Sequence, residues 1–207
     1  TADEMNAAVA AIEAAMDNLT KMVYTVTFNP DNGEEVTTVS VETGKKAKKP
    51  ANPTKEGYTF RGWYLNSSLT SIYNFTSMPA SNITLYAKWE INEYRLSFVT
   101  YTESISDIFY EYNQEIEEFE TLTRTGYTFM GWYLDSNFNQ VYNLENMPAR
   151  NVIVYAKWQI NPYVITFNSN QGSSIGNQVL NYNASITTLE NPTRLGYTFK
   201  GWYTNEA

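Results

Sequence analysis

The chain has 207 residues, enough for one large domain or for two to three small ones. Its formal net charge of −8 argues against nucleic acid as the main partner, because phosphate binding needs a basic surface. The sequence contains neither Cys nor His, which excludes disulfides, Cys-ligated zinc and the commonest general base. Most hydrolases and metalloenzymes are therefore excluded, and we expect no cofactor and no metal.

No apolar run reaches the roughly 18 residues that a membrane-spanning helix needs, so we expect no membrane span. The first residues lack the basic and apolar regions of a signal peptide. Because the chain opens on Thr1 rather than Met, we expect it to be a piece of a longer protein.

An amphipathic helix is predicted at the N-terminus, within residues 1–22. Asp3 opens an Ala-rich stretch in which apolar residues recur every three or four positions: Met5, Val9, Ile12, Met16 and Leu19. We expect either the tail of a preceding domain or a helix docked on the domain C-terminal to it. A dimerising coiled coil is the alternative, although two heptads rarely hold together alone.

The rest of the chain repeats itself about every seventy residues. The phrase GYTFxGWY begins at Gly57, Gly126 and Gly196, and YAKW begins at Tyr86 and Tyr155. We therefore divide the chain into repeat 1 (23–92), repeat 2 (93–161) and repeat 3 (162–207), the last without the MPA and YAKW segments. A period this long predicts a string of small domains rather than a continuous solenoid.

Within a repeat, alternating apolar residues from Tyr24 predict a first strand, and Asp31-Asn32-Gly33 predicts a tight turn into a second. A short covering helix is predicted next, because apolar pairs spaced three apart recur there. These pairs are Ala47/Pro50, Ile116/Phe119 and Ile186/Leu189. Strands at GYTFxGWY and NITLYAKW complete the order β-β-α-β-(short β)-β. The fold class expected is α+β, as tandem β-grasp (ubiquitin-like) domains that are mostly β.

These motifs identify a resemblance. GYTFRGWYL, MPASNITLYAKW and YTVTFNPDNG resemble the Listeria–Bacteroides repeat, also called the internalin B-repeat, across residues 23–207. The resemblance implies a β-grasp fold and a role as an interaction or spacer module in bacterial surface and secreted proteins. Repeat 2 departs from the pattern, because no Gly follows Phe98 and NPT becomes Thr121-Leu122-Thr123.

The tryptophans are the first residues that suggest a function. Indole faces stack on sugar rings, so a carbohydrate-binding module for host or cell-wall glycans is one hypothesis. It requires exposed aromatic rings. The competing interpretation, which we prefer, is a core signature, because the Trp positions recur in the strand pattern: Trp63, Trp89, Trp132, Trp158 and Trp202. Gly62 and Gly131 beside them are predicted to allow close packing.

Charged residues suggest an interaction surface. The only basic run is Lys45, Lys46, Lys48 and Lys49, and repeat 2 places Glu115, Glu117 and Glu118 there instead. Opposite charge in neighbouring repeats could steer association. Solvation is the simpler interpretation. We expect no calcium site at Asp31 and no acid–base pair at Glu117 and Glu120, since neither has the partners it needs.

We thus expect a non-enzymatic array of an extracellular or surface-attached bacterial protein, acting as a spacer and adhesion surface. Its partner would be a protein on a host or the same cell surface, or a glycan. Self-association through repeat 3 or the N-terminal helix is a further expectation, because the GYTF strand of repeat 3 lacks its YAKW neighbour. We expect another chain's strand or the N-terminal helix to cover the edge at 197–203, unless the repeat boundary lies elsewhere.

Overall fold

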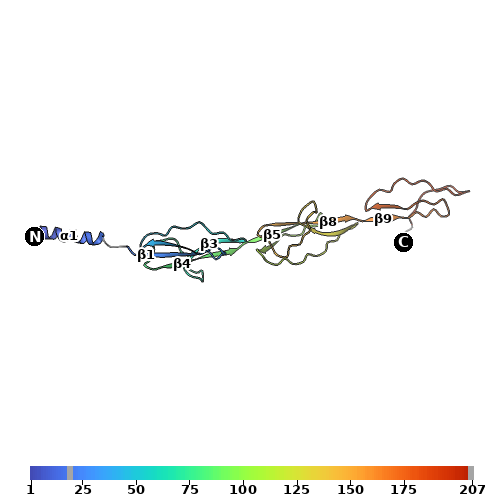
Figure 1. Cartoon of the computed structure of the whole chain (residues 1–207). Coiled ribbons are helices and arrows are strands. Elements are labelled where there is room, and N and C mark those ends of the chain that lie inside the picture. The colour runs from blue at the N-terminus through green and yellow to red at the C-terminus, as the bar shows by residue number, and fades with distance from the viewer. Residues whose placement is uncertain (18–20, 205–207) are drawn as a thin grey trace. The chain divides into compact units, whose positions relative to one another are not determined.

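A computed structural model describes residues 1–17 and 21–204 (Figure 1). The chain divides into two compact units. The first contains residues 1–93 together with Glu111–Asn113, and the second contains Tyr94–Tyr110 and the chain from Gln114 onward.

Helix α1 (Ala2–Asp17) confirms the N-terminal helix that the apolar spacing predicts. Its apolar stripe is open to solvent, however: Met5, Val9, Ile12 and Met16 are each 48–68% exposed. The expectation that this stripe docks on repeat 1 is therefore wrong for these four residues, while Leu19 lies outside the described residues. Among the helices that the structure describes, none is long and apolar enough to cross a membrane.

The first unit is built on a four-stranded mixed sheet in the order β2-β1-β4-β3. Its strands are β1 (Val23–Asn29), β2 (Thr37–Glu42), β3 (Tyr58–Tyr64) and β4 (Ile83–Ile91). The central strands β1 and β4 run parallel, whereas β2 and β3 pair antiparallel with their neighbours at the edges. The loop between β1 and β2 covers residues 30–36, so the tight turn predicted at Asp31-Asn32-Gly33 is a longer connection.

The second unit contains the same arrangement one period later. Its four-stranded sheet has the order β6-β5-β8-β7. The strands are β5 (Glu93–Val99), β6 (Ile108–Glu111), β7 (Tyr127–Tyr133) and β8 (Val152–Ile160). Strands β5 and β8 are parallel, as β1 and β4 are. The mixed sheet predicted for each of these repeats is present in both.

The covering helix predicted in each repeat is wrong, because α1 is the single helix among the described residues. After a turn, the segments that follow β2 and β6 each contain an isolated β-bridge and no helix. Their backbone groups pair with the MPA segments instead: Ile116 N–H donates to Glu145 O at 2.8 Å, and Met147 N–H donates to Gln114 O at 2.9 Å. Repeat 1 has the equivalent bond from Met78 N–H to Lys45 O. Groups used in this way cannot close helical turns.

In repeats 1 and 2, the pairs that predicted the helix still bury an apolar residue where the segment crosses the core. Ala47 and Ile116 are buried, and Phe119 packs against the core of repeat 2. In these two repeats, apolar residues spaced three apart therefore indicate contact with the core and do not indicate a helix.

A β-bulge changes which residues of the GYTFxGWY strands face the core. Strict alternation would place Phe60 and Trp63 on opposite faces. In β3 the register with β4 shifts between Phe60 and Gly62, so that Phe60 opposes Trp89 and Trp63 opposes Ala87. Because Trp89 and Ala87 share one face of β4, both aromatic residues point into the core. Strand β7 has the same shift between Phe129 and Trp132.

Each of the two complete repeats has its own aromatic core. In the first, Trp63 lies edge-on to Phe28 at 5.0 Å and to Phe60 at 5.5 Å between ring centroids. In the second, Trp132 packs against Phe98 at 5.5 Å and Phe129 at 5.6 Å. Edge-to-face pairs at these distances add stability beyond burial alone.

Repeat 3 contains the hairpin of β9 (Pro162–Ile165) and β10 (Gln178–Asn181). The strand predicted at 197–203 is absent. In repeats 1 and 2 that strand pairs with the YAKW strand, β4 or β8, and the sequence has no third YAKW. Trp202 still packs on Phe167 at 5.2 Å and on Phe199 at 5.3 Å, whereas Ile186 is 58% exposed.

Candidate functional site

The charged segments after the second strands occupy equivalent places in the two sheets. An isolated bridge between Lys46 and Ser77 holds the first segment, and one between Glu115 and Asn146 holds the second. Ala47 and Ile116 are the buried anchors, and the charged side chains predicted as an interaction surface are all exposed. They are Lys45, Lys46, Lys48 and Lys49 in repeat 1 and Glu115, Glu117 and Glu118 in repeat 2.

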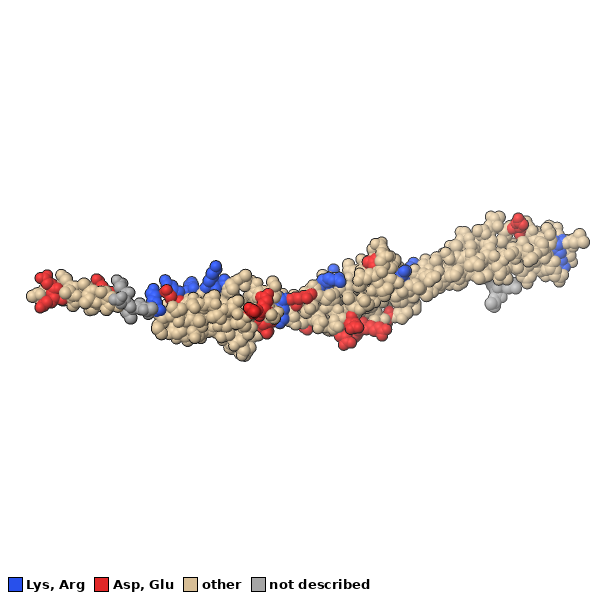
Figure 2. Space-filling view, viewed as in Figure 1, with Lys and Arg blue, Asp and Glu red and all other residues tan. Residues whose placement is uncertain are grey.

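Figure 2 shows a row of blue side chains on the first unit, which also carries red ones, and a group of red side chains on the second. The same backbone position thus carries a positive surface in one repeat and a negative surface in the next. Glu117 and Glu120 are both exposed to solvent. A carboxylate pair tuned for acid–base catalysis usually lies in a buried or cleft environment, which these two lack.

None of the five tryptophans is exposed. Trp63 and Trp132 are buried, with 3% and 8% of their surface accessible, and Trp89, Trp158 and Trp202 are half-buried. The indole N–H of Trp89 donates to Pro30 O at 2.8 Å, and that of Trp158 donates to Thr100 O at 2.8 Å. Trp63 and Trp132 therefore present no open face to a sugar ring, and the other three indoles are each partly covered.

The remaining indole N–H groups have a different environment. Nε1 of Trp63, Trp132 and Trp202 is buried and has no hydrogen-bond partner within the described part of the chain. Aromatic rings pack against each of these three indoles. The recurrence in all three repeats makes this a property of the fold.

Gly62 and Gly131 are needed for the backbone rather than for close packing. Their φ angles are +127° and +101°, in the region that favours glycine. A β-carbon on Gly131 would meet no described atom within 4 Å, and one on Gly62 would lie at an ordinary 3.5 Å from Ile72. The prediction that close packing selects these glycines is wrong, because the bulge selects them.

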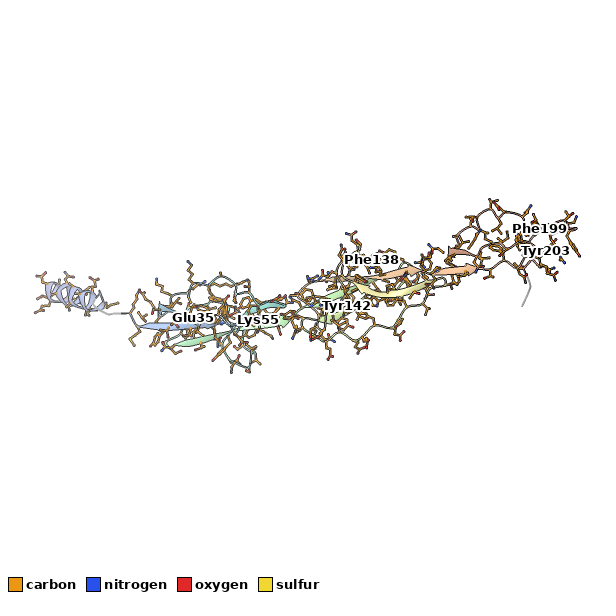
Figure 3. The ribbon with its side chains drawn as sticks, turned by 45° about the vertical axis from the view of Figure 1, so that its right-hand side comes forward. Glu35, Lys55, Phe138, Tyr142, Phe199 and Tyr203 are labelled. Carbon is orange, nitrogen blue, oxygen red and sulfur yellow. The ribbon has the colours of Figure 1, made fainter. Side chains whose placement is uncertain are left out.

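A cation lies over the first Tyr of each GYTF segment, which sequence reasoning missed. Lys55 Nζ is 4.8 Å from the Tyr58 ring centroid, and Figure 3 labels this lysine. In repeats 2 and 3, the guanidinium carbon of Arg124 lies 3.8 Å from the Tyr127 centroid, and that of Arg194 lies 4.0 Å from Tyr197. Aligning the repeats would have shown a cation two residues before each of these glycines.

The cation also ties this turn to the first loop. Lys55 Nζ donates to Asp31 O at 2.9 Å, and Arg194 donates to Asn170 O at 3.1 Å.

In the first loop, Asn29 Oδ1 accepts from Asp31 N–H and Asn32 Oδ1 accepts from Glu34 N–H. These side-chain amide oxygens therefore stabilise the turn by accepting backbone hydrogen bonds. Across the described residues, no group of three or more His, Cys, Asp or Glu is placed to hold a metal ion.

One shallow hollow lies in repeat 1. It opens to solvent and is lined by Lys49, Arg61, Gly62, Trp63, Ile72, Tyr73, Asn74 and Phe75. Burial raises the pKa of Tyr73, one of the lining residues, so this phenol stays neutral over a wider pH range. In repeat 2, Tyr142 (Figure 3) has its pKa raised by burial and by the nearby Tyr110.

The family model of the Listeria-Bacteroides repeat domain matches the chain three times, at residues 24–88, 94–157 and 163–207. A protein of Evansella cellulosilytica named as a membrane protein is 37% identical over 187 residues, which are 89% of this chain and 28% of that protein. A protein of the same bacterium named as a Gly-rich membrane protein is 37% identical over 184 residues, 87% of this chain and 21% of the relative.

Internalin H of Listeria monocytogenes is 36% identical over 146 residues, which are 67% of this chain and 25% of internalin H. The chain therefore spans less than a third of the length of each of these three relatives.

Proposed function

Because the chain belongs to the Listeria-Bacteroides repeat domain family, we propose that it is a non-enzymatic module of a bacterial cell-surface or secreted protein. The module acts as a spacer and offers a surface for protein contacts. Its domains are the repeats at 23–92, 93–161 and 162–207. Repeats 1 and 2 are variants of the β-grasp fold in which a non-helical segment replaces the covering helix.

One observation supports this proposal. Repeats 1 and 2 have the same kind of core but differ in the charge of one exposed segment. The sheet order and the aromatic cluster recur in repeats 1 and 2. The exposed segment at 45–49 is basic, whereas the equivalent at 114–118 is acidic. A scaffold that is constant inside and variable outside suits a binding array, because surface charge can change without disturbing the fold. The similarity to internalin H supports placement on the cell surface.

Surface placement can be tested on intact cells of the bacterium that makes the protein. We expect an antibody raised against repeats 1 and 2 to label unbroken cells. Brief protease treatment should remove the label and leave a cytoplasmic marker intact. Labelling that appears only after lysis would contradict the proposal.

The interaction surface needs a separate test on purified chain. Lys45, Lys46, Lys48 and Lys49 are changed together to Gln, and Glu115, Glu117 and Glu118 together to Gln in a matched variant. Binding to cultured host cells should fall for one variant and should weaken with added salt. Equal binding by both variants would contradict a charge-directed contact. Loss of binding after enzymatic deglycosylation of the cells would favour a glycan partner.

A further inference from the structure

In the second unit, the ring of Tyr182 lies directly on the α-carbon of Gly126. A β-carbon built on Gly126 would be 2.1 Å from Cγ and 2.2 Å from Cδ1 of Tyr182. These ring atoms lie near the backbone and cannot swing aside as the end of a long side chain would. Gly126 belongs to the turn that precedes β7 in repeat 2, and Tyr182 follows β10 in repeat 3. The contact therefore joins two consecutive repeats.

Backbone hydrogen bonds hold the same two residues in place through the residue that links the repeats. Asn161 N–H donates to Gly126 O at 2.9 Å, and Asn161 O accepts from Tyr182 N–H at 3.0 Å. The Thr128 hydroxyl donates to Asn161 Oδ1 at 2.7 Å. One asparagine between β8 and β9 thus bonds both to the turn of the earlier repeat and to the hairpin of the later one.

Aromatic rings complete the contact. The Tyr182 ring lies 6.2 Å from Tyr127 at an interplanar angle of 72°, and 6.3 Å from Tyr163 at 55°. Arg124 lies over the Tyr127 ring. Tyr182 is therefore surrounded by a glycine α-carbon, a tyrosine of the earlier repeat and a tyrosine of its own hairpin.

The first compact unit contains the same set of contacts. A β-carbon on Gly57 would be 2.0 Å from Cγ of Tyr112, and the Tyr58 and Tyr112 rings are 6.0 Å apart at 77°. Asn92 N–H donates to Gly57 O and Asn92 O accepts from Tyr112 N–H, both at 2.9 Å. The Thr59 hydroxyl donates to Asn92 Oδ1 at 2.5 Å. Recurrence of the glycine contact, the tyrosine ring pair and the three hydrogen bonds of the linking asparagine indicates a feature of the repeat rather than a chance contact.

We propose that the glycine of each GYTF turn is a socket for the tyrosine that follows the second strand of the next repeat. Together with the linking asparagine, this pair sets the angle between consecutive repeats. The partner is thus defined chemically: a tyrosine that follows a hairpin and is held by a backbone bond to the linking asparagine. The proposal goes beyond the spacer function and holds whether or not the array lies on a cell surface.

Two further positions of the repeat show that the glycine turn also forms, and the second strand also ends, without the glycine–tyrosine contact. Repeat 1 has Thr43 where the other repeats have tyrosine, and Thr43 bonds to Met22 O through its N–H and its hydroxyl. Gly196 has φ +79°, like +78° at Gly126, yet no described atom would lie within 4 Å of its β-carbon. Gly196 therefore provides a turn with equal backbone strain and no ring above it.

The test uses the whole chain with spin labels on two introduced cysteines. Because the sequence contains no Cys, Ser136→Cys in repeat 2 and Ser174→Cys in repeat 3 can be labelled without side reactions. Both serines are exposed. Pulsed electron–electron double resonance then measures the distribution of distances between the repeats. We expect one narrow peak, which Gly126→Ala shifts and broadens because the methyl group displaces the tyrosine ring.

Two matched variants separate ring displacement from backbone strain. Gly196→Ala imposes the same unfavourable φ without a clash and should keep the narrow peak. Tyr182→Ala should broaden the peak, whereas Tyr182→Phe should retain it because the ring itself fills the socket. Near-UV circular dichroism of the Trp132 core shows whether each variant keeps repeat 2 folded.

A narrow, unshifted peak in both Gly126→Ala and Tyr182→Ala would overturn the proposal. If Gly126→Ala unfolds repeat 2, Tyr182→Ala still decides the question, since it removes a half-buried ring and leaves every backbone bond in place. Surface labelling of cells does not depend on these variants, so failure here would leave the surface proposal standing.

Discussion

At the scale of single residues, burial changes the ionisation of two tyrosines, one in each complete repeat. Tyr73 and Tyr142 lie against the aromatic cores of repeats 1 and 2, and the pKa of each phenol is raised. Burial is the main cause, because it disfavours the phenolate. The hydroxyl of Tyr73 also lies 3.5 Å from Thr76 O, which the neutral form alone can use as an acceptor.

The raised pKa values predict a loss of stability in alkaline solution. In the unfolded chain a tyrosine titrates near pH 10, and in the folded chain these two titrate higher. Below the unfolded value the full stabilisation is present, and it is lost as pH rises from there through the folded pKa.

We expect Tyr142→Phe to flatten the alkaline decline in urea midpoint for the second unit. Tyr203→Phe is the control, because Tyr203 is 80% exposed and should leave the decline unchanged (Figure 3). The same alkaline slope in both variants would show that Tyr142 is not responsible.

At the scale of secondary-structure elements, the second glycine of GYTFxGWY, Gly62 or Gly131, allows both the Phe and the Trp of that strand to face the core. The register shift in β3 and β7 brings Phe and Trp three residues apart to the same face. An unbroken strand would turn one of these rings to solvent. The bulge therefore allows two large rings of one edge strand to pack beside the Trp of the neighbouring strand.

We expect Gly131→Ala to destabilise the second unit by about 1–3 kcal/mol, the usual range for a residue forced into a sparsely populated backbone region. Steric overlap does not contribute, since a β-carbon there meets no described atom within 4 Å. Gly176→Ala is the matched control, because Gly176 is equally open and has no φ in the left-handed region. Urea unfolding followed by Trp fluorescence measures both. A neutral Gly131→Ala would show that the bulge does not require glycine.

At the scale of the whole molecule, each compact unit has its own core. One buried cluster centres on Val26, Leu85 and Trp63, and the other on Leu96, Val154 and Trp132. No buried residue is shared between the two clusters. Damage to one core should therefore be felt mainly in the unit that contains it.

Val154→Ala should cost about 2 kcal/mol, from about 0.8 kcal/mol per buried methylene and the cavity left behind. Val154 is completely buried, whereas Ile153 beside it on β8 is 44% exposed, so Ile153→Ala should cost less than about 1 kcal/mol. Hydrogen exchange should show lower protection in β5, β7 and β8 for Val154→Ala and little change in β1 and β4. An equal loss in both sheets would mean that the two cores unfold as one.

The sequence by itself determined the family, the three repeats, the N-terminal helix and the mixed sheets of repeats 1 and 2. These features follow from local signals that recur along the chain. GYTFxGWY, YAKW and the alternation along β1 and β4 can be recognised in the sequence because each strand's own residues specify them. Trp63, Trp89, Trp132 and Trp158 could be placed on strands for the same reason.

The tertiary structure alone decided the rest, because those features depend on partners far away in the chain. The 44–50 and 114–119 segments form no helix, since residues in and beside the MPA segments take up their backbone groups, and spacing of three could not reveal this. The glycines of the strands serve a bulge that appears only when the neighbouring strand sets the register. Gly57 and Gly126 lie under a tyrosine of the next repeat, and no local pattern connects two residues more than fifty positions apart.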